Sequence, residues 1–113
     1  RTSTGYADVF VRLCDVDPDG RSVNVCDGLQ RITPETFPAD ADATHTVPVR
    51  LWPTAYRFRP GHRLRLQISG GSFPRFARNT GTGEPLGSAT RLVPTDHEIR
   101  HLSSITLPVQ PGT

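Results

Sequence analysis

Apolar and polar residues alternate on both sides of an explicit turn near the start of the chain. Segment 7–13 alternates with a period of two, which predicts a half-buried strand, and segment 23–27 predicts its partner. Between them, Pro18 supplies the φ of about −65° that the second position of a type I turn favours, and Gly20 can take the positive φ that closes a bulged loop. The pattern therefore predicts a β-hairpin.

This turn also predicts the register of the hairpin, with Asp17 facing Arg21. Leu13 then lies opposite Val25, Val11 opposite Asp27 and Asp15 opposite Val23, so the apolar members share one face. The other face carries Phe10, Arg12, Cys14, Val16, Ser22, Asn24 and Cys26. An aromatic ring and two thiols among polar groups indicate that this second face is covered. The diagonal offset of the two cysteines favours buried free thiols over a disulfide.

Further strands are predicted after a polar, proline-containing loop at residues 30–43. Segment 64–68 has the cleanest alternation and follows a Pro-Gly turn at residues 59–62. The other predicted strands are 47–52, which contains Pro48 and so suits a sheet edge, 98–102, and 104–109 with Ile105, Leu107 and Val109 inward. No segment shows helical periodicity, and Gly and Pro separate short strands. The fold class predicted is all-β, an antiparallel sandwich.

Composition predicts one domain over residues 1–113, with no second domain. The net charge of +2 is mild and its charges are interspersed, so no nucleic-acid partner is predicted. No apolar run reaches the length of a membrane span, so no membrane partner is predicted either. The chain has no Met and opens on Arg1, from which we expect a piece of a longer protein. A cytoplasmic location is favoured.

Two motifs suggest metal sites, and each has a simpler reading. His97-Glu98-Ile99-Arg100-His101 matches the zinc protease pattern H-E-x-x-H, but no third ligand follows it, and on a strand the two His stand about 13 Å apart. Residues 15–20 resemble half of an EF-hand calcium loop, yet turn carboxylates that bond their own backbone explain the same letters. No metal and no cofactor are therefore predicted. A self-contained Ser triad is unsupported as well, because no G-x-S-x-G elbow occurs.

Three stretches resemble one family in the family's own order. They are RLCDVDPDGRS at 12–22, LWPTAY at 51–56 with FRPGHRLRLQIS at 58–69, and FPRFARNTGTG at 73–83. They are similar to the C-terminal, non-catalytic domain of the CocE/NonD and X-Pro dipeptidyl-peptidase family of serine hydrolases. The resemblance implies a jelly-roll, galactose-binding-like β-sandwich that follows an α/β-hydrolase domain. It begins part-way into the family's domain, so one or more N-terminal strands are expected to be missing.

The resemblance also implies an accessory role. The catalytic Ser, Asp and His belong to the family's hydrolase domain, so no catalytic residue is expected here and the segment alone should be inactive. The partner expected is that hydrolase domain of the same parent chain, an acyl esterase or dipeptidyl-peptidase, whose substrate cleft this domain helps to wall. The residues proposed for the cleft wall or domain interface are Phe73, Arg75, Phe76, Arg78 and Asn79.

Two further expectations accompany this reading. A sheet that lacks a strand exposes unpaired backbone groups, which predicts a homodimer or strand exchange. The alternative function is a carbohydrate-binding module, in which Trp52, Tyr56 and Phe73 would serve as platforms for sugars, although a core or interface role explains these rings more simply. A zinc metalloprotease is the third and least supported function.

Overall fold

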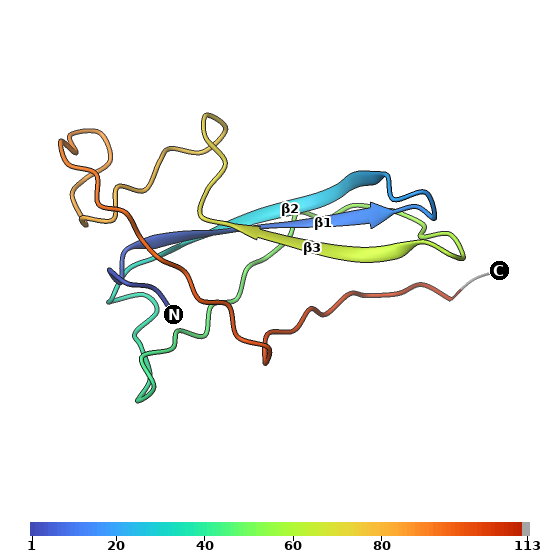
Figure 1. The fold of residues 1–113 in the computed structure, drawn as a ribbon, viewed down its shortest axis with the longest axis horizontal. Helices are drawn as coiled ribbons and strands as arrows, with labels where there is room; N and C mark the ends of the chain where they lie inside the picture. The colour runs from blue at the N-terminus through green and yellow to red at the C-terminus, as the bar shows by residue number, and fades with distance from the viewer. Residues whose placement is uncertain (112–113) are drawn as a thin grey trace.

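The computed structural model describes residues 1–111, and within them the regular structure is one antiparallel sheet of three strands. These are β1 (Ala7–Val16), β2 (Ser22–Ile32) and β3 (Arg63–Ser69), in the spatial order β2-β1-β3 (Figure 1). The predictions of an all-β fold, of the hairpin and of the strand at 64–68 are confirmed. No helix long and apolar enough to cross a membrane occurs in this part of the chain.

The hairpin turn has the geometry that its sequence predicts. The Asp17 N–H donates to the Arg21 carbonyl at 2.9 Å, and the Gly20 N–H donates back to the Asp17 carbonyl at 3.0 Å. Gly20 has a φ of +89°, which only glycine adopts without strain. The Asp17 carboxylate accepts hydrogen bonds from the backbone N–H groups of Asp19 and Arg21, at 2.9 and 2.8 Å. The Asp17 carboxylate therefore stabilises the backbone of its own turn.

A β-bulge changes the predicted register beyond the first pairs. Asp15 lies opposite Val23 as predicted, but the register shifts between Leu13 and Cys14. Leu13 then pairs with Cys26 and Val11 with Gly28, so the predicted partners Val25 and Asp27 are wrong. The extra residue of the bulged strand also moves Cys26 onto the face of Leu13, away from Cys14. Both cysteines are free, Cys14 buried and Cys26 half-buried.

Two other predicted segments need correction. β2 continues to Ile32, so residues 30–32 are strand and not loop, because they pair with the beginning of β1. Segment 47–52 is not a strand; it runs beside β2 and makes a single backbone hydrogen bond, from the Trp52 N–H to the Asp27 carbonyl at 2.9 Å. A Cβ atom added at Gly28 would lie 2.2 Å from the Arg50 carbonyl oxygen, so only glycine permits this close approach.

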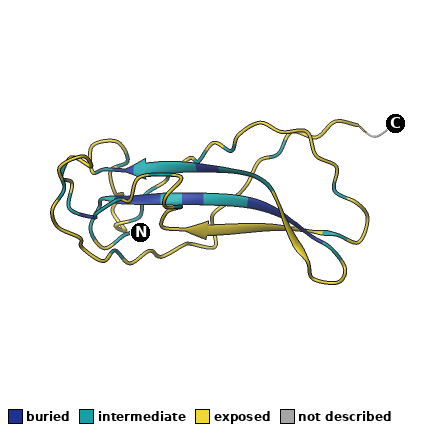
Figure 2. Ribbon diagram, turned by 90° about the horizontal axis from the view of Figure 1, so that it is seen from above, coloured by how far each residue is buried: buried dark blue, intermediate teal, exposed yellow. Residues whose placement is uncertain are grey.

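The two predicted C-terminal strands are also absent from the described residues. Residues 98–102 contain only a turn, and segment 104–109 is extended without a partner (Figures 1 and 2). Ile105 and Val109, predicted to point inward, are exposed, and Leu107 is half-buried. Alternation alone does not make a strand, because the backbone groups also need a neighbouring edge.

Strand β1 is the centre of the structure, and its two faces can be named by the residues that alternate along it. Ala7, Val9, Val11, Leu13 and Asp15 lie on what we call the Leu13 face, and the even-numbered residues from Asp8 to Val16 lie on the Phe10 face. Phe10, Leu13 and Val16 are almost fully buried, so β1 is covered on both faces. Figure 2 shows this burial along β1 and its absence along β3.

β3 carries an apolar stripe on the Leu13 face that the described residues leave uncovered. Leu64, Leu66 and Ile68 pair with Asp15, Leu13 and Val11, and they are 56%, 40% and 38% exposed. The radius of gyration is 16.3 Å, whereas a compact domain of this length has about 13 Å. Both observations describe one sheet without a complete second layer.

Candidate functional site

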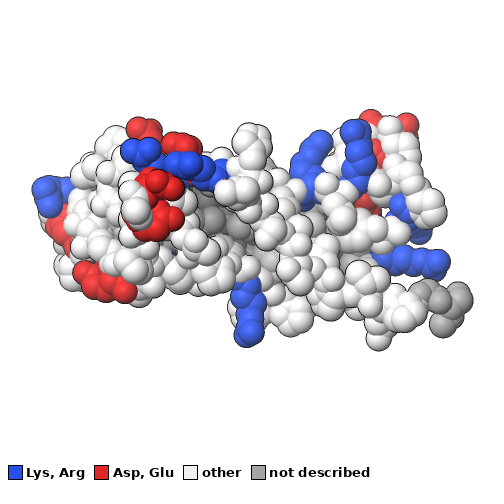
Figure 3. Space-filling view, turned by 90° about the horizontal axis from the view of Figure 1, so that it is seen from below, with Lys and Arg blue, Asp and Glu red and all other residues white. Residues whose placement is uncertain are grey.

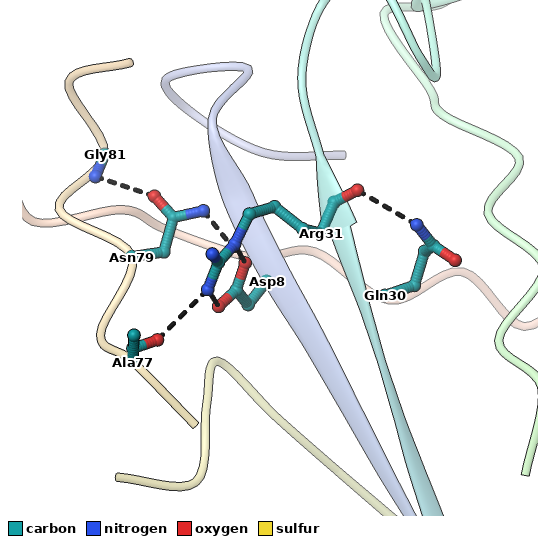
Figure 4. A network of polar contacts seen from close by, with 6 residues as sticks. All are labelled: Asp8, Gln30, Arg31, Ala77, Asn79 and Gly81. Atoms are coloured by element: carbon teal, nitrogen blue, oxygen red, sulfur yellow. Dashed lines mark hydrogen bonds and ion pairs between the residues drawn. The ribbon is translucent and has the colours of Figure 1, made fainter. Parts of the chain in front are cut away.

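The long loop after β3 is held to the hairpin by a buried carboxylate. Asp8, 2% exposed, accepts two hydrogen bonds from Arg31, from Nε at 2.8 Å and from Nη2 at 2.7 Å. The Asn79 side-chain amide donates a third, at 2.9 Å (Figure 4). A buried carboxylate is tolerated only when a counter-charge and hydrogen bonds replace its lost hydration, and the bidentate Arg31 supplies both.

Arg31 and Asn79 extend this network into the backbone of the loop. Arg31 Nη2 also donates to the Ala77 carbonyl at 3.0 Å, and the Asn79 side-chain oxygen accepts from the Gly81 N–H at 3.0 Å. Gly81 has a φ of +75°, and a Cβ atom there would meet the Val93 carbonyl oxygen at 2.7 Å. The stretch 77–81 is therefore fixed between the start of the hairpin and the chain around residue 93.

The residues that the sequence proposed for this loop divide into anchors and an exposed pair. Phe76 packs against the buried Phe10, with ring centroids 6.2 Å apart, and Arg75 lies over the Phe76 ring and forms an ion pair with Asp27. Together with Asn79, these residues attach the loop to the Phe10 face. The attached loop explains why Phe10 and Cys14 can lie on the Phe10 face, although most other residues of that face are polar.

Phe73 and Arg78 form the exposed pair. The Arg78 guanidinium lies 4.7 Å from the centroid of the Phe73 ring, and Phe73 is 65% exposed. Aromatic residues and arginine are both enriched in protein interfaces, and the cation–π attraction holds this pair together. Of the five proposed residues, these two remain available for contact with another body.

A second polar cluster, which the sequence reasoning missed, lies at the opposite end of β1. Asp15, 5% exposed, accepts a hydrogen bond from the Tyr56 hydroxyl at 2.5 Å, and its other oxygen lies 2.8 Å from His62 Nδ1. The Tyr56 hydrogen bond lowers the pKa of Asp15, and His62 lowers it further against the opposing effect of burial. The same hydrogen bond raises the pKa of Tyr56. The available signal was an acidic residue at an otherwise apolar position of the Leu13 face.

The motifs that suggested metals make other contacts. Residues 97–101 form no helix; His97 bridges to Thr2, and the Glu98 N–H donates to the Arg1 carbonyl at 2.8 Å. Across residues 1–111, no three His, Cys, Asp or Glu side chains gather as ligands. The H-E-x-x-H segment thus lacks the helical turn that would place His97 and His101 on one face.

The three rings considered as sugar platforms are exposed, which contradicts a core role for them in this chain. Trp52 lies beside β2, whereas Tyr56 donates its hydroxyl to Asp15 and has Phe58 against its ring with centroids 5.0 Å apart. Phe73 is stacked with Arg78. Two of the three rings are therefore engaged by the chain's own side chains.

Comparison with known proteins gives one family and several relatives. The model of the X-Pro dipeptidyl-peptidase C-terminal non-catalytic domain matches residues 1–105. The cocaine esterase of Rhodococcus sp. (strain MB1 Bresler) is 34% identical over 115 residues, which cover 90% of this chain and 20% of that protein. Two mycobacterial proteins whose names include the words serine esterase, from Mycobacterium bovis and Mycobacterium tuberculosis, are each 34% identical over 90 residues, 60% of this chain and 14% of theirs. The chain thus spans a fifth or less of these relatives.

The Asp8 network predicts a large loss of stability when its charge is removed. Asp8→Asn leaves the partly exposed Arg31 without a counter-charge, and we expect the free energy of unfolding to fall by about 3 kcal/mol, the low end for a broken buried pair. Asn79→Ala removes one neutral hydrogen-bond donor and should lower the free energy of unfolding by about 1 kcal/mol. Urea denaturation measures both. Glu98→Gln, which breaks the exposed ion pair with Arg100, is the control. It should change the free energy of unfolding by less than about 1 kcal/mol. An Asp8→Asn variant as stable as the control would contradict the anchoring role.

The Asp15 cluster predicts a dependence of stability on pH. Because the folded-state pKa of Asp15 is lowered, its stabilising contribution is complete above the ordinary Asp pKa of about 3.9 and is lost as the pH falls through the folded value. Tyr56→Phe removes the largest cause, so the Asp15 pKa should rise and acid unfolding should begin at a higher pH. NMR titration of the Asp15 carboxyl carbon measures the pKa directly. Tyr6→Phe is the matched control, and an Asp15 pKa that is equal in both variants would disprove the assignment.

Proposed function

Because the chain belongs to the family of X-Pro dipeptidyl-peptidase C-terminal non-catalytic domains, we propose that it packs on the α/β-hydrolase domain of a serine hydrolase and helps to wall its substrate cleft. The parent enzyme would be an acyl esterase or an X-Pro dipeptidyl-peptidase. The single observation that carries the proposal is the exposed Phe73–Arg78 pair at the tip of an anchored loop. This chain supplies no catalytic group in the proposal and is inactive alone.

The anchors of the loop support a role in shaping a cleft. An exposed loop that contacts a substrate or a neighbouring domain binds more tightly when its conformation is already fixed, because less entropy is lost on contact. Asn79 and Phe76 fix the loop from below, one by hydrogen bonding to Asp8 and the other by packing on Phe10. The tip at Phe73 and Arg78 is consequently presented in one orientation.

The uncovered stripe on β3 supports packing against a second body. Leu64, Leu66 and Ile68 form a continuous apolar row along one face of an edge strand. Burial of such a row contributes roughly 25 cal/mol for each Å² removed from water, which favours a covering layer over solvent. In the parent enzyme we propose that protein outside these 113 residues provides that layer. The free thiols Cys14 and Cys26 fit a reducing compartment, and we propose the cytoplasm.

The cleft-wall proposal predicts a kinetic effect without a change in stability. In the parent enzyme, Phe73→Ala and Arg78→Gln should each lower kcat/KM for an ester or acyl-dipeptidyl substrate by about tenfold, because a stacked aromatic–arginine contact near the cleft is lost. Thermal unfolding should be unchanged, since neither side chain anchors the loop. Leu92→Ala, an exposed apolar residue outside the five proposed, is the control. Unchanged kinetics in both loop variants would overturn the cleft-wall role.

The isolated chain is predicted to dimerise or to exchange strands through β3. Its outer edge has no strand partner within residues 1–111, and unpaired edges with apolar side chains pair readily with another chain. Light scattering coupled to gel filtration should give twice the chain mass of 12.4 kDa. Leu66→Lys should yield monomer, whereas Leu92→Lys, a matched charge at another exposed leucine, should not. Monomer at every concentration for the unaltered chain would refute the dimer.

A further inference from the structure

A small pocket lies at the turn end of the hairpin, on the Leu13 face. It has a volume of about 190 Å³, and three arginines line it, Arg21 from the turn and Arg57 and Arg59 from the segment before β3. Arg side chains lie at this end of the molecule together with acidic ones, at the right-hand end in Figure 3. This volume is below that of a pocket for a drug-sized ligand and suits a group of a few heavy atoms.

The acidic residues of the pocket are already occupied by hydrogen bonds within the chain. Asp15 holds Tyr56 with one oxygen and His62 with the other. Asp17 accepts two backbone N–H groups of its own turn on a single oxygen. Neither carboxylate forms an ion pair with a pocket arginine in the described part of the chain.

The three arginines of the pocket belong to the larger group of arginines that form no ion pair with a carboxylate in the described residues. Within residues 1–111, Arg31, Arg75, Arg91 and Arg100 each form an ion pair with a carboxylate. No such pair occurs for Arg21, Arg57 or Arg59 in the same residues, although all three line one concave site. Three arginines and the carboxylates of Asp15 and Asp17 together leave the lining with a formal net positive charge, which attracts a small anion.

The segment that carries two of these arginines is held at both ends. Tyr56 and His62 are bound to the same carboxylate, that of Asp15, so the chain between them is clamped. Within the clamp, Phe58 packs on the Tyr56 ring, and the His62 N–H donates to the Arg59 carbonyl at 3.1 Å to close the turn. Arg57 and Arg59 therefore project from a backbone that is organised before any ligand arrives, which lowers the entropy lost on binding.

We propose that this pocket binds a small oxyanion, a phosphate or carboxylate group, through Arg57 and Arg59 with Arg21 at its rim. Guanidinium groups donate paired N–H bonds to the oxygens of such a group, and the pocket size admits one. The proposal is independent of the packing role of the loop, because it uses none of the loop residues.

The test titrates the chain with inorganic phosphate at constant ionic strength and follows backbone amide shifts by NMR. Saturable shifts should be confined to residues 15–23 and 56–62, and acetate should compete for the same site. The tighter of the two anions identifies the group as phosphate or carboxylate. Shifts that do not saturate, or that spread over the whole surface, would overturn the proposal.

A pair of double variants separates a built site from diffuse charge. Arg57→Gln with Arg59→Gln should weaken phosphate binding at least tenfold. Arg63→Gln with Arg65→Gln removes the same charge from the same end of the molecule, but these residues pair with Val16 and Cys14 and so lie on the Phe10 face. This control should stay within twofold of the unaltered chain. Equal weakening in both variants would show that net charge alone attracts the anion and would overturn the pocket.

Discussion

The structure depends on how β1 accommodates two buried carboxylates. β1 is paired on both edges and covered on both faces, yet it contains Asp8 near one end and Asp15 near the other, 2% and 5% exposed. The two residues are seven positions apart, so alternation puts one on each face. Burial without partners is prohibitive for a charge, so each carboxylate must attract donors from elsewhere in the chain. Asp8 is hydrogen-bonded by Arg31 and by Asn79 of the long loop. Asp15 is hydrogen-bonded by Tyr56 and His62, which lie in the segment before β3.

These two attachments explain how long irregular segments acquire fixed positions. Within residues 1–111, three strands of 10, 11 and 7 residues supply the regular hydrogen bonding, so the rest of the described chain needs other anchors. On the Phe10 face, the Asp8 network and the packing of Phe76 leave Phe73 and Arg78 as the free tip of the loop. On the Leu13 face, the Asp15 clamp fixes the backbone on which Arg57 and Arg59 stand. Each candidate site is thus a consequence of satisfying one buried charge.

The sequence predicted the elements whose partners are local. The hairpin follows from Pro18 and Gly20, and β3 follows from its alternation after a second turn. The bulge at Val25 could not be predicted, because the turn residues carry no signal for it. This bulge places Cys26 on the opposite face from the one predicted. Segments 47–52 and 104–109 also alternate but form no strand in the described structure, because a strand needs hydrogen-bonding partners on a neighbouring strand, which alternation does not reveal. The loop residues were found through family resemblance, whereas their division into anchors and a free pair required the position of Asp8. The Asp15 cluster could have been predicted, because Asp15 is an acidic residue at a position of the alternating pattern that is otherwise apolar.

The uncovered stripe and the arginine pocket belong to the same side of the sheet. Leu64, Leu66 and Ile68 continue the Leu13 face, and Asp15, which lines the pocket, pairs directly with Leu64. A body that covers the stripe therefore comes to the rim of the pocket as well, whereas the Phe73–Arg78 tip stands over the other face, where Phe76 and Asn79 attach. A three-stranded sheet is close to the smallest that is stable in water, so covering this face and stabilising the fold are the same event. The exposure of β3 and the radius of gyration of 16.3 Å both reflect the incomplete second layer of the described residues, on the face that the proposed packing would cover.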